Sequence, residues 1–254
     1  MSIRDDGELA VELAAAAGEL LLELRATALS GRELGARGDE LANELLISGL
    51  RERRPDDAVL SEESADTADR LSARRVWVID PLDGTREYGE ADRSDWAVHV
   101  ALWEDGELAA GAVALPARRI VHDTNAPRLL PPRPDGPPRI AVSRSRPPAL
   151  VEQLAVELAA ELVPMGSAGV KATAVLRGEV DAYVHAGGQY EWDSAAPVAV
   201  ARAVGLFCSR IDGSPLRYNQ PDPKLPDLVV CRPEISAKLL ASIAGQSSPE
   251  ERVS

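Results

Sequence analysis

The chain has little cysteine, and this limits the environment in which it is expected to fold. Only 2 cysteines occur among its 254 residues, Cys208 and Cys231. Two cysteines cannot build a disulfide framework, and this pair lacks the short spacing of a zinc or redox motif. We therefore expect two buried thiols in a reducing compartment, which favours a cytoplasmic location.

Basic side chains are scarce relative to acidic ones. The sequence holds 28 Lys+Arg against 41 Asp+Glu, a formal net charge of −13. Proteins that bind nucleic-acid polymers or anionic membrane surfaces use clustered Lys and Arg, so this balance argues against both partners. A small anionic ligand would need something other than the bulk charge to attract it, and a bound cation is the obvious candidate.

Long apolar runs are missing as well. Residues 1–8 carry no basic segment ahead of an apolar stretch, so no signal peptide is indicated. The most apolar early run, residues 11–24, is interrupted by Glu12, Glu19 and Glu23. Leu9, Leu13, Leu20 and Leu24 fall on one helical face, which predicts an amphipathic packing helix and not a membrane span.

Proline marks the predicted boundary between two halves of the chain. Prolines crowd residues 126–138, where they remove backbone donors and fix φ, so no regular element fits there. The predicted organisation is an N-terminal α+β domain over 1–126, a linker over 127–138, a C-terminal α/β domain over 139–246 and a flexible tail over 247–254.

The two halves differ in their predicted elements. Helical periodicity dominates to about Arg54, with a second helix expected to start near Asp39, and an Asp-Gly turn predicts a hairpin of 96–103 with 108–115. Beyond the linker, strands and helices alternate, which favours a layer of largely parallel strands. The further predicted strands are 58–61, 76–79, 140–142, 180–184, 206–209 and 228–231, and the later helices are 148–162, 169–177, 194–204 and one from Pro233.

The strongest local signal is the sequence VWVIDPLDGT at residues 76–85. An apolar strand delivers Asp80 at its end, and Asp83 returns three residues later, so both carboxylates can converge with the Leu82 carbonyl between them. Such hard oxygen ligands suit Mg²⁺. Gly84 and Thr85 then offer backbone N–H groups to a phosphate. The alternative interpretation is that Asp-Pro-x-Asp-Gly is turn chemistry alone.

Two other acidic segments lie at the edges of apolar elements. Glu62 and Glu63 follow a short apolar strand, and Asp193 opens an apolar helix more than a hundred residues later. Each has an ordinary alternative, since Asp193 could be a helix N-cap and the Glu pair a solvated loop. Three acidic sites at such boundaries are harder to explain separately.

Residues 61–64, 80–85 and 192–196 resemble, in order and separation, the three signature motifs of the inositol monophosphatase superfamily of Mg²⁺-dependent, lithium-sensitive phosphatases. Within it, residues 143–146, 166–171, 191–193 and 215–219 are most similar to the CysQ-type 3′-phosphoadenosine 5′-phosphate phosphatases. The resemblance implies an α/β sugar-phosphatase fold of alternating α-β-α-β-α layers, with an N-terminal antiparallel sheet and a C-terminal mostly parallel sheet.

The resemblance also implies a site with two or three Mg²⁺ ions. Glu63 would lie behind the ligands, and Asp39 with the Thr85 hydroxyl would position the attacking water. Arg37 stands where the family usually has a threonine, so the binding of a third ion is an open question. The implied metal ligands are Glu62, Asp80, the Leu82 carbonyl, Asp83 and Asp193, and the implied phosphate-binding N–H groups are those of Gly84 and Thr85.

The implied activity is hydrolysis of the 3′-phosphate of 3′-phosphoadenosine 5′-phosphate to AMP and phosphate, with Li⁺ as an expected inhibitor. An inositol-1-phosphate or fructose-1,6-bisphosphate phosphatase is the alternative within the class. A metal- or nucleotide-binding regulator without activity is the alternative outside it. Members of the family are often dimers, so a homodimer is an open expectation.

Several polar residues carry weaker signals. Lys171 with Ser167, and Arg144 with Arg146, could contact a second phosphate, or could be ordinary surface residues. His185 could line the pocket or serve a structural role. No role is assigned to His99 or His122, and the tryptophans at 77, 96 and 103 are expected in the core.

Overall fold

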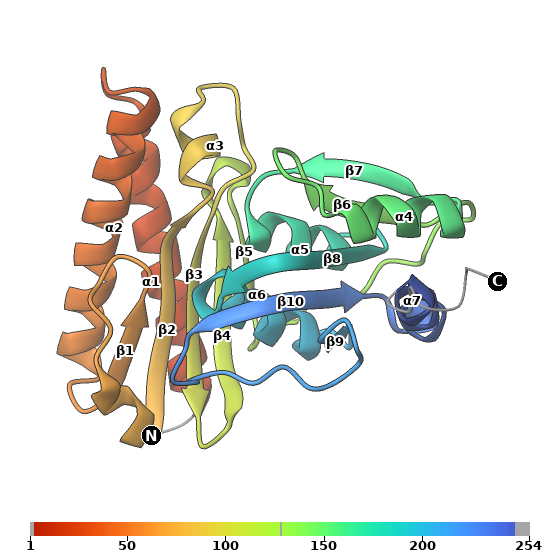
Figure 1. The fold of residues 1–254 in the computed structure, drawn as a ribbon. Coiled ribbons are helices and arrows are strands. Elements are labelled where there is room, and N and C mark those ends of the chain that lie inside the picture. The colour runs from red at the N-terminus through yellow and green to blue at the C-terminus, as the bar shows by residue number, and fades with distance from the viewer. Residues whose placement is uncertain (1–2, 128, 247–254) are drawn as a thin grey trace.

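The computed structural model describes residues 3–127 and 129–246, so the tail predicted over 247–254 lies outside the described residues. The fold is mixed α/β, as expected, and the described part contains two five-stranded sheets. Figure 1 shows five layers in the order helices, sheet, helices, sheet, helices. No described helix is long and apolar enough to cross a membrane.

The first sheet has the strand order β1-β2-β3-β4-β5 and is antiparallel except for its β1–β2 pair. Side chains along β2 alternate, so Trp77 and Ile79 pack toward α1 and α2, whereas Val76 and Val78 pack toward α6. Both faces of the sheet are therefore buried. The elements are α1 (Ile3–Arg25), α2 (Gly31–Arg53), β1 (Ala58–Ser61), η1 (Ala68–Ser72), β2 (Arg75–Asp83), α3 (Thr85–Gly89), β3 (Ala97–Glu104), β4 (Glu107–Leu115), η2 (Pro116–Arg118) and β5 (Ile120–Asp123).

The second sheet has the order β7-β6-β8-β10-β9. β6 is parallel to β7 and β8, whereas β10 is antiparallel to β8 and β9, so the expected mostly parallel sheet is mixed. Helices α5 and α6 lie between the two sheets, and α4 and α7 cover the outer face. The elements are β6 (Arg139–Ser143), α4 (Ala149–Leu158), β7 (Glu161–Met165), α5 (Ala168–Leu176), β8 (Ala182–Tyr190), α6 (Glu191–Ala203), β9 (Phe207–Ser209), β10 (Lys224–Cys231) and α7 (Pro233–Gln246).

Helix α2 begins at Gly31 and not near Asp39, so Asp39 lies inside the helix. Its glycines are poor helix formers, but they allow close packing. A Cβ on Gly35 would lie 2.7 Å from Thr85 Cγ2, and one on Gly38 would lie 2.9 Å from the Tyr88 ring. Close packing against α3 thus explains why α2 contains Gly35 and Gly38, the residues that made its start hard to predict from the sequence.

The helix predicted over 148–162 is also wrong at its end. α4 stops at Leu158, Ala159 adopts a left-handed conformation, and residues 161–165 form β7. β7 is an edge strand that pairs only with β6, which is a position that tolerates Pro164. The predicted hairpin is confirmed, with Asp105 and Gly106 at positive φ in its turn.

Candidate active site

The candidate site begins where β2 ends. Along the β2–β3 pair, Asp80 lies opposite His99 and Asp83 opposite Ala97, so three steps on one strand match two on the other. Such a bulge bends the strand and redirects its side chains. Both carboxylates are buried, with Asp80 only 1% and Asp83 only 7% exposed.

Asp83 is held by the start of α5. Its carboxylate accepts hydrogen bonds from the Ser167 hydroxyl and from the backbone N–H groups of Ala168 (3.1 Å) and Gly169 (2.7 Å). Burial opposes ionisation of Asp83, but the hydrogen bond and charge of His99, together with Lys171 and Ser167, lower its pKa to about 2. Asp83 is therefore an anchored, ionised group.

His99 also belongs to the site, although the sequence analysis assigns it no role. Its Nε2 lies 3.2 Å from Asp83 Oδ2, its Nδ1 lies 3.9 Å from Asp80 Oδ2, and Nδ1 also lies 3.0 Å from the Trp192 carbonyl oxygen. Among the described residues, Asp80, Asp83 and His99 form a group whose ligand atoms all lie within 4.8 Å of one another, close enough to hold a metal ion. Only the register of β3 against β2 could have revealed this, because His99 belongs to no motif.

Asp80 carries the least compensated charge. One of its oxygens accepts from the Leu82 N–H at 3.1 Å, whereas Oδ2 is buried without a hydrogen-bond partner among the described residues. Burial and the charges of Glu62, Asp83 and Asp193 raise the pKa of Asp80 well above its usual value. A buried, unpartnered carboxylate oxygen of this kind calls for a cation.

Glu62 and Asp193 reach the same place from distant parts of the chain. Glu62 follows β1, and although the residue is solvent-exposed, desolvation of its carboxylate and the charges of Asp193 and Asp83 raise its pKa to about 7. Asp193 is the third residue of α6, where burial and the charge of Asp83 raise its pKa to about 6. The charges of Glu62 and Asp193 therefore act on the carboxylates at the end of β2.

The alternative interpretation of Asp193, as a residue that caps the start of a helix, is correct in part. Its Oδ2 accepts a hydrogen bond from the Tyr190 backbone N–H at 2.7 Å, so it does satisfy a backbone donor at the helix start. It does so from the third helical position and not as the N-cap.

The donor set fits a hard divalent cation. The Leu82 carbonyl accepts from the Thr85 hydroxyl at 3.1 Å, and this hydroxyl also lies 3.2 Å from Asp39 Oδ1. Oxygen donors dominate, one of them is orphaned, and the carboxylates raise one another's pKa, which a bound cation would relieve.

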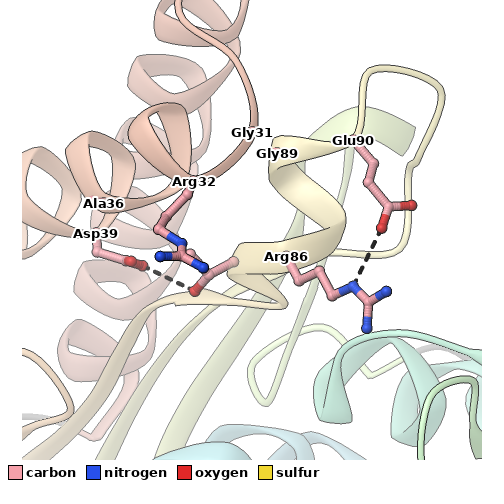
Figure 2. A pocket seen from close by; sticks show the side chains of 8 residues that line it. Gly31, Arg32, Ala36, Asp39, Arg86, Gly89 and Glu90 are labelled. Atoms are coloured by element: carbon pink, nitrogen blue, oxygen red, sulfur yellow. Dashed lines mark hydrogen bonds and ion pairs between the residues drawn. The ribbon is translucent and has the colours of Figure 1, made fainter.

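Asp39 and Thr85 form a second part of the site, at a pocket of about 460 Å³. The Thr85 hydroxyl lies 3.2 Å from Asp39 Oδ1, and burial together with the charge of Glu63 raises the pKa of Asp39 to about 7. Figure 2 shows Asp39 and Arg32 on the α2 side of α3, whereas Arg86 and Glu90 pair with each other on its opposite side. The pocket is lined by Gly31, Arg32, Ala36, Asp39, Thr85, Arg86, Gly89 and Glu90.

Gly84 links the two parts. It has φ of 88°, a left-handed conformation that suits glycine, and it immediately precedes α3. A Cβ there would lie 3.2 Å from the Asp95 carbonyl oxygen. The first-turn N–H groups that follow have no intrahelical acceptor, so they are available to a ligand.

The four weaker candidates for contact with a second phosphate lie in different surroundings. Lys171 is buried, its Nζ donates to the carbonyls of Gly166 (3.0 Å) and Ser167 (2.6 Å), and burial lowers its pKa. The interpretation of Lys171 as a surface residue is wrong. Arg144 pairs with Glu87 at 2.7 Å and with Glu90, and Arg146 lies on an exposed loop.

The family profile of the inositol monophosphatase family matches residues 5–127 and 140–248 of this chain. The chain belongs to the inositol monophosphatase family. The 3′-phosphoadenosine 5′-phosphate phosphatase of Mycobacterium leprae (strain TN) is 54% identical over 260 residues, covering 94% of this chain and 93% of that protein. The protein of the same name from Mycobacterium bovis is 53% identical over 238 residues, covering 90% and 89%.

Solved structures agree on the fold. The crystal structure of CysQ from Bacteroides thetaiotaomicron, a bacterial member of the inositol monophosphatase family, has a TM-score of 0.81 at 24% identity, covering 90% of this chain and 97% of that one. Inositol monophosphatase II from Staphylococcus aureus MSSA476 has a TM-score of 0.82 at 19% identity, covering 97% and 98%. At these identities the likeness concerns the fold alone.

Proposed function

We propose that this chain hydrolyses the 3′-phosphate of 3′-phosphoadenosine 5′-phosphate, with Mg²⁺ as cofactor, to give AMP and inorganic phosphate. Support comes from relatives of that name that are more than half identical over nearly the whole chain. The observation that supports the chemistry is the buried pair Asp80 and Asp83 at the end of β2, on which the charges of Glu62 and Asp193 act, together with the hydrogen bond between Thr85 and Asp39.

Two or three Mg²⁺ ions would be held by Glu62, Asp80, the Leu82 carbonyl, Asp83 and Asp193. When bound, Mg²⁺ would offset the charge of the substrate phosphate and acidify a water molecule. Asp83, anchored on α5, would give the most rigid ligand, because its partners leave it little freedom. Glu63 would act behind the ligands through its charge on Asp39.

Asp39 and Thr85 would position and deprotonate the attacking water. The Thr85 hydroxyl would hold the water by an accepting lone pair, because its hydrogen is directed to Asp39 or to the Leu82 carbonyl. Asp39 would accept the water's proton, since a pKa of about 7 suits a general base near neutral pH. The backbone N–H groups of Gly84 and Thr85 would donate to phosphoryl oxygens as the bond to the leaving 3′ oxygen breaks.

A second phosphate of the substrate would bind near Ser167 and Lys171, with Arg144 and Arg146 at the rim. Arg144 would have to exchange Glu87 or Glu90 for the phosphate. We further propose a cytoplasmic location, a homodimer and inhibition by Li⁺.

The test is a comparison of substrates at fixed Mg²⁺ with the purified full-length chain. We expect a higher kcat/KM for 3′-phosphoadenosine 5′-phosphate than for inositol-1-phosphate or fructose-1,6-bisphosphate, and no release without Mg²⁺. A preference for either of the other two would replace the substrate assignment. Absence of phosphate release from all three would favour a regulator without activity.

A further inference from the structure

The imidazole of His99 contacts two elements that carry candidate metal ligands, β2 and α6, and a third, α5, that holds one of those ligands in place. It projects from β3, is fully buried, and touches the end of β2 and the start of α6, while α5 passes against it. It belongs to none of the motifs that mark the family. The inference below rests on the proposed Mg²⁺ site.

The first contact ties His99 to α6. Nδ1 lies 3.0 Å from the carbonyl oxygen of Trp192, and because a carbonyl oxygen only accepts, Nδ1 carries a hydrogen. Trp192 is the residue before Asp193. The ring therefore holds the backbone that delivers the ligand from the C-terminal half of the chain.

The second contact ties the same ring to Asp83. Nε2 lies 3.2 Å from Asp83 Oδ2, the oxygen that also accepts from the Gly169 N–H and the Ser167 hydroxyl. Two hydrogen bonds from the start of α5 and an ion-pair contact from β3, which lacks hydrogen-bond geometry, thus meet at one carboxylate oxygen. The orientation of Asp83 depends on this arrangement.

The third relation is a close approach that only glycine allows. A Cβ on Gly169 would lie 2.0 Å from His99 Nε2 and 2.9 Å from Cε1. The first turn of α5 therefore rests against the ring. Removing or displacing the ring would release both α5 and Asp83.

His99 is better suited to support a ligand than to be one. Nδ1 is used by the Trp192 carbonyl, Nε2 faces a carboxylate oxygen, and Mg²⁺ prefers oxygen donors. We propose that His99 is a positioning residue, which holds Asp83 on β2 and the Trp192–Asp193 backbone of α6 in the relative placement that lets their ligands meet one cation.

The experiment uses two substitutions, each of which keeps one of the two polar contacts of the His99 ring and removes the other. In His99→Gln the side-chain amide reaches the position of Nε2 and keeps a donor for Asp83, whereas in His99→Asn it reaches only the position of Nδ1 and keeps the donor for Trp192. Mg²⁺ binding to the substrate-free chain is measured by titration calorimetry, alongside kcat and KM for 3′-phosphoadenosine 5′-phosphate.

We expect Mg²⁺ binding roughly 10–100-fold weaker in His99→Asn, the usual cost of losing a partner behind a ligand. His99→Gln should recover most of that loss, and kcat should fall more than KM changes. Equal Mg²⁺ affinity in wild type and His99→Asn would overturn the proposal. A fall in the melting temperature alone, with unchanged Mg²⁺ affinity, would overturn it as well.

His122 provides the matched control. It is a buried histidine of the same sheet, and Val113 pairs with both histidines, so all three residues share one row across the strands. His122→Asn should lower the melting temperature and leave Mg²⁺ affinity unchanged. An equal loss of Mg²⁺ affinity in His122→Asn would mean that any buried histidine has this effect, which would overturn the specific role of His99.

A second pair of variants covers the case in which His99→Asn does not fold. Gly169→Ala alone should disturb the ring, whereas adding His99→Ala frees the space for the new methyl group and should restore folding. The double variant still lacks the donor for Asp83, so its Mg²⁺ affinity should stay low. A folded double variant with wild-type affinity would refute the positioning role.

Failure of this proposal and failure of the proposed function give different results. A wild-type chain that binds Mg²⁺ but hydrolyses no phosphomonoester would sink the proposed function, while weaker binding in His99→Asn would still support the role of His99. Intact hydrolysis with unchanged Mg²⁺ binding in His99→Asn would reject only the role of His99.

Discussion

Buried acidic groups lie at both ends of strand β2, and their charges are compensated differently at the two ends. At its start, Asp6 is fully buried and receives Arg54 at 2.7 Å and Arg75 at 3.1 Å. Arg75 also pairs with Asp57 at 2.9 Å, and the Trp77 indole N–H donates to Asp57 at 2.8 Å. Each acid there has a guanidinium partner.

At its end, β2 delivers Asp80 and Asp83 into a cluster with Glu62 and Asp193. Among the described residues no arginine pairs with Asp80 or Asp83, and the ion-pair partner of both is His99. Burial of unmatched carboxylates is costly, so a fold keeps them where a cation is to be bound. The comparison teaches that the missing partner, and not burial itself, distinguishes a site from a structural ion network.

The largest effect is expected from Asp83→Asn. The substitution keeps the shape of the side chain but removes the charge that a cation needs, so turnover should fall by at least about 10³-fold, which is ~4 kcal/mol. Phosphate release measures the loss, and circular dichroism checks that the fold persists. Unchanged turnover would refute the proposed metal role of this end of β2.

Next in size is Arg54→Met, at the other end. It removes one buried partner of Asp6, so we expect a loss of about 3 kcal/mol in the free energy of unfolding, as for other broken buried pairs. Denaturant titration measures this loss. Activity per folded molecule should be unchanged, and a drop in kcat comparable to that of Asp83→Asn would contradict the division between the two ends.

A smaller effect is expected from pH in the absence of metal. The folded-state pKa of Glu62 (about 7), of Asp193 (about 6) and of Asp80 lies above the unfolded value. The folded chain therefore binds more protons than the unfolded chain between about pH 4 and pH 7, and its stability is lost as the pH rises through the folded-state values.

We expect metal-free protein to be less stable at pH 8 than at pH 5 by about 2 kcal/mol, or roughly 5 °C in melting temperature, because solvent screening of the exposed Glu62 reduces the full effect of these shifts. The low pKa of Asp83, about 2, affects stability only below this window. Mg²⁺ should restore the melting temperature at pH 8 and do little at pH 5. Scanning calorimetry at both pH values, with and without Mg²⁺, measures this, and equal melting temperatures without Mg²⁺ would contradict the unmatched cluster.

The smallest effect is expected from Gly35→Ala. The added methyl group would lie 2.7 Å from Thr85 Cγ2, so it should shift Thr85 against Asp39 and lower kcat by about 3–10-fold, at a packing cost of ~1–2 kcal/mol. Gly245→Ala is the control, because its Cβ would enter open space in α7. That variant should gain a few tenths of a kcal/mol and keep full activity. Equal kcat in both variants would remove Thr85 from the chemistry.

Local patterns predicted much of the fold and the core of the site. The Asp-Gly turn specified the β3–β4 hairpin, and an apolar strand ending in Asp80 and Asp83 indicated a carboxylate pair, because both signals depend on neighbours in sequence. The start of α2 was misplaced because Gly35 and Gly38 weaken local helix propensity, and their value lies in packing against α3. The direction of β10 was missed because pairing direction is not written in a strand's own residues.

The sequence by itself determined the family, the carboxylate motifs and the layered α/β class, since these rest on residue identity and local periodicity. Only the tertiary structure decided that Lys171 on α5 is buried, that Arg144 pairs with glutamates, and that His99 joins Asp83 to the start of α6. The physical reason is that burial and long-range contact depend on the register of strands and the packing of helices, which bring together residues more than ninety positions apart.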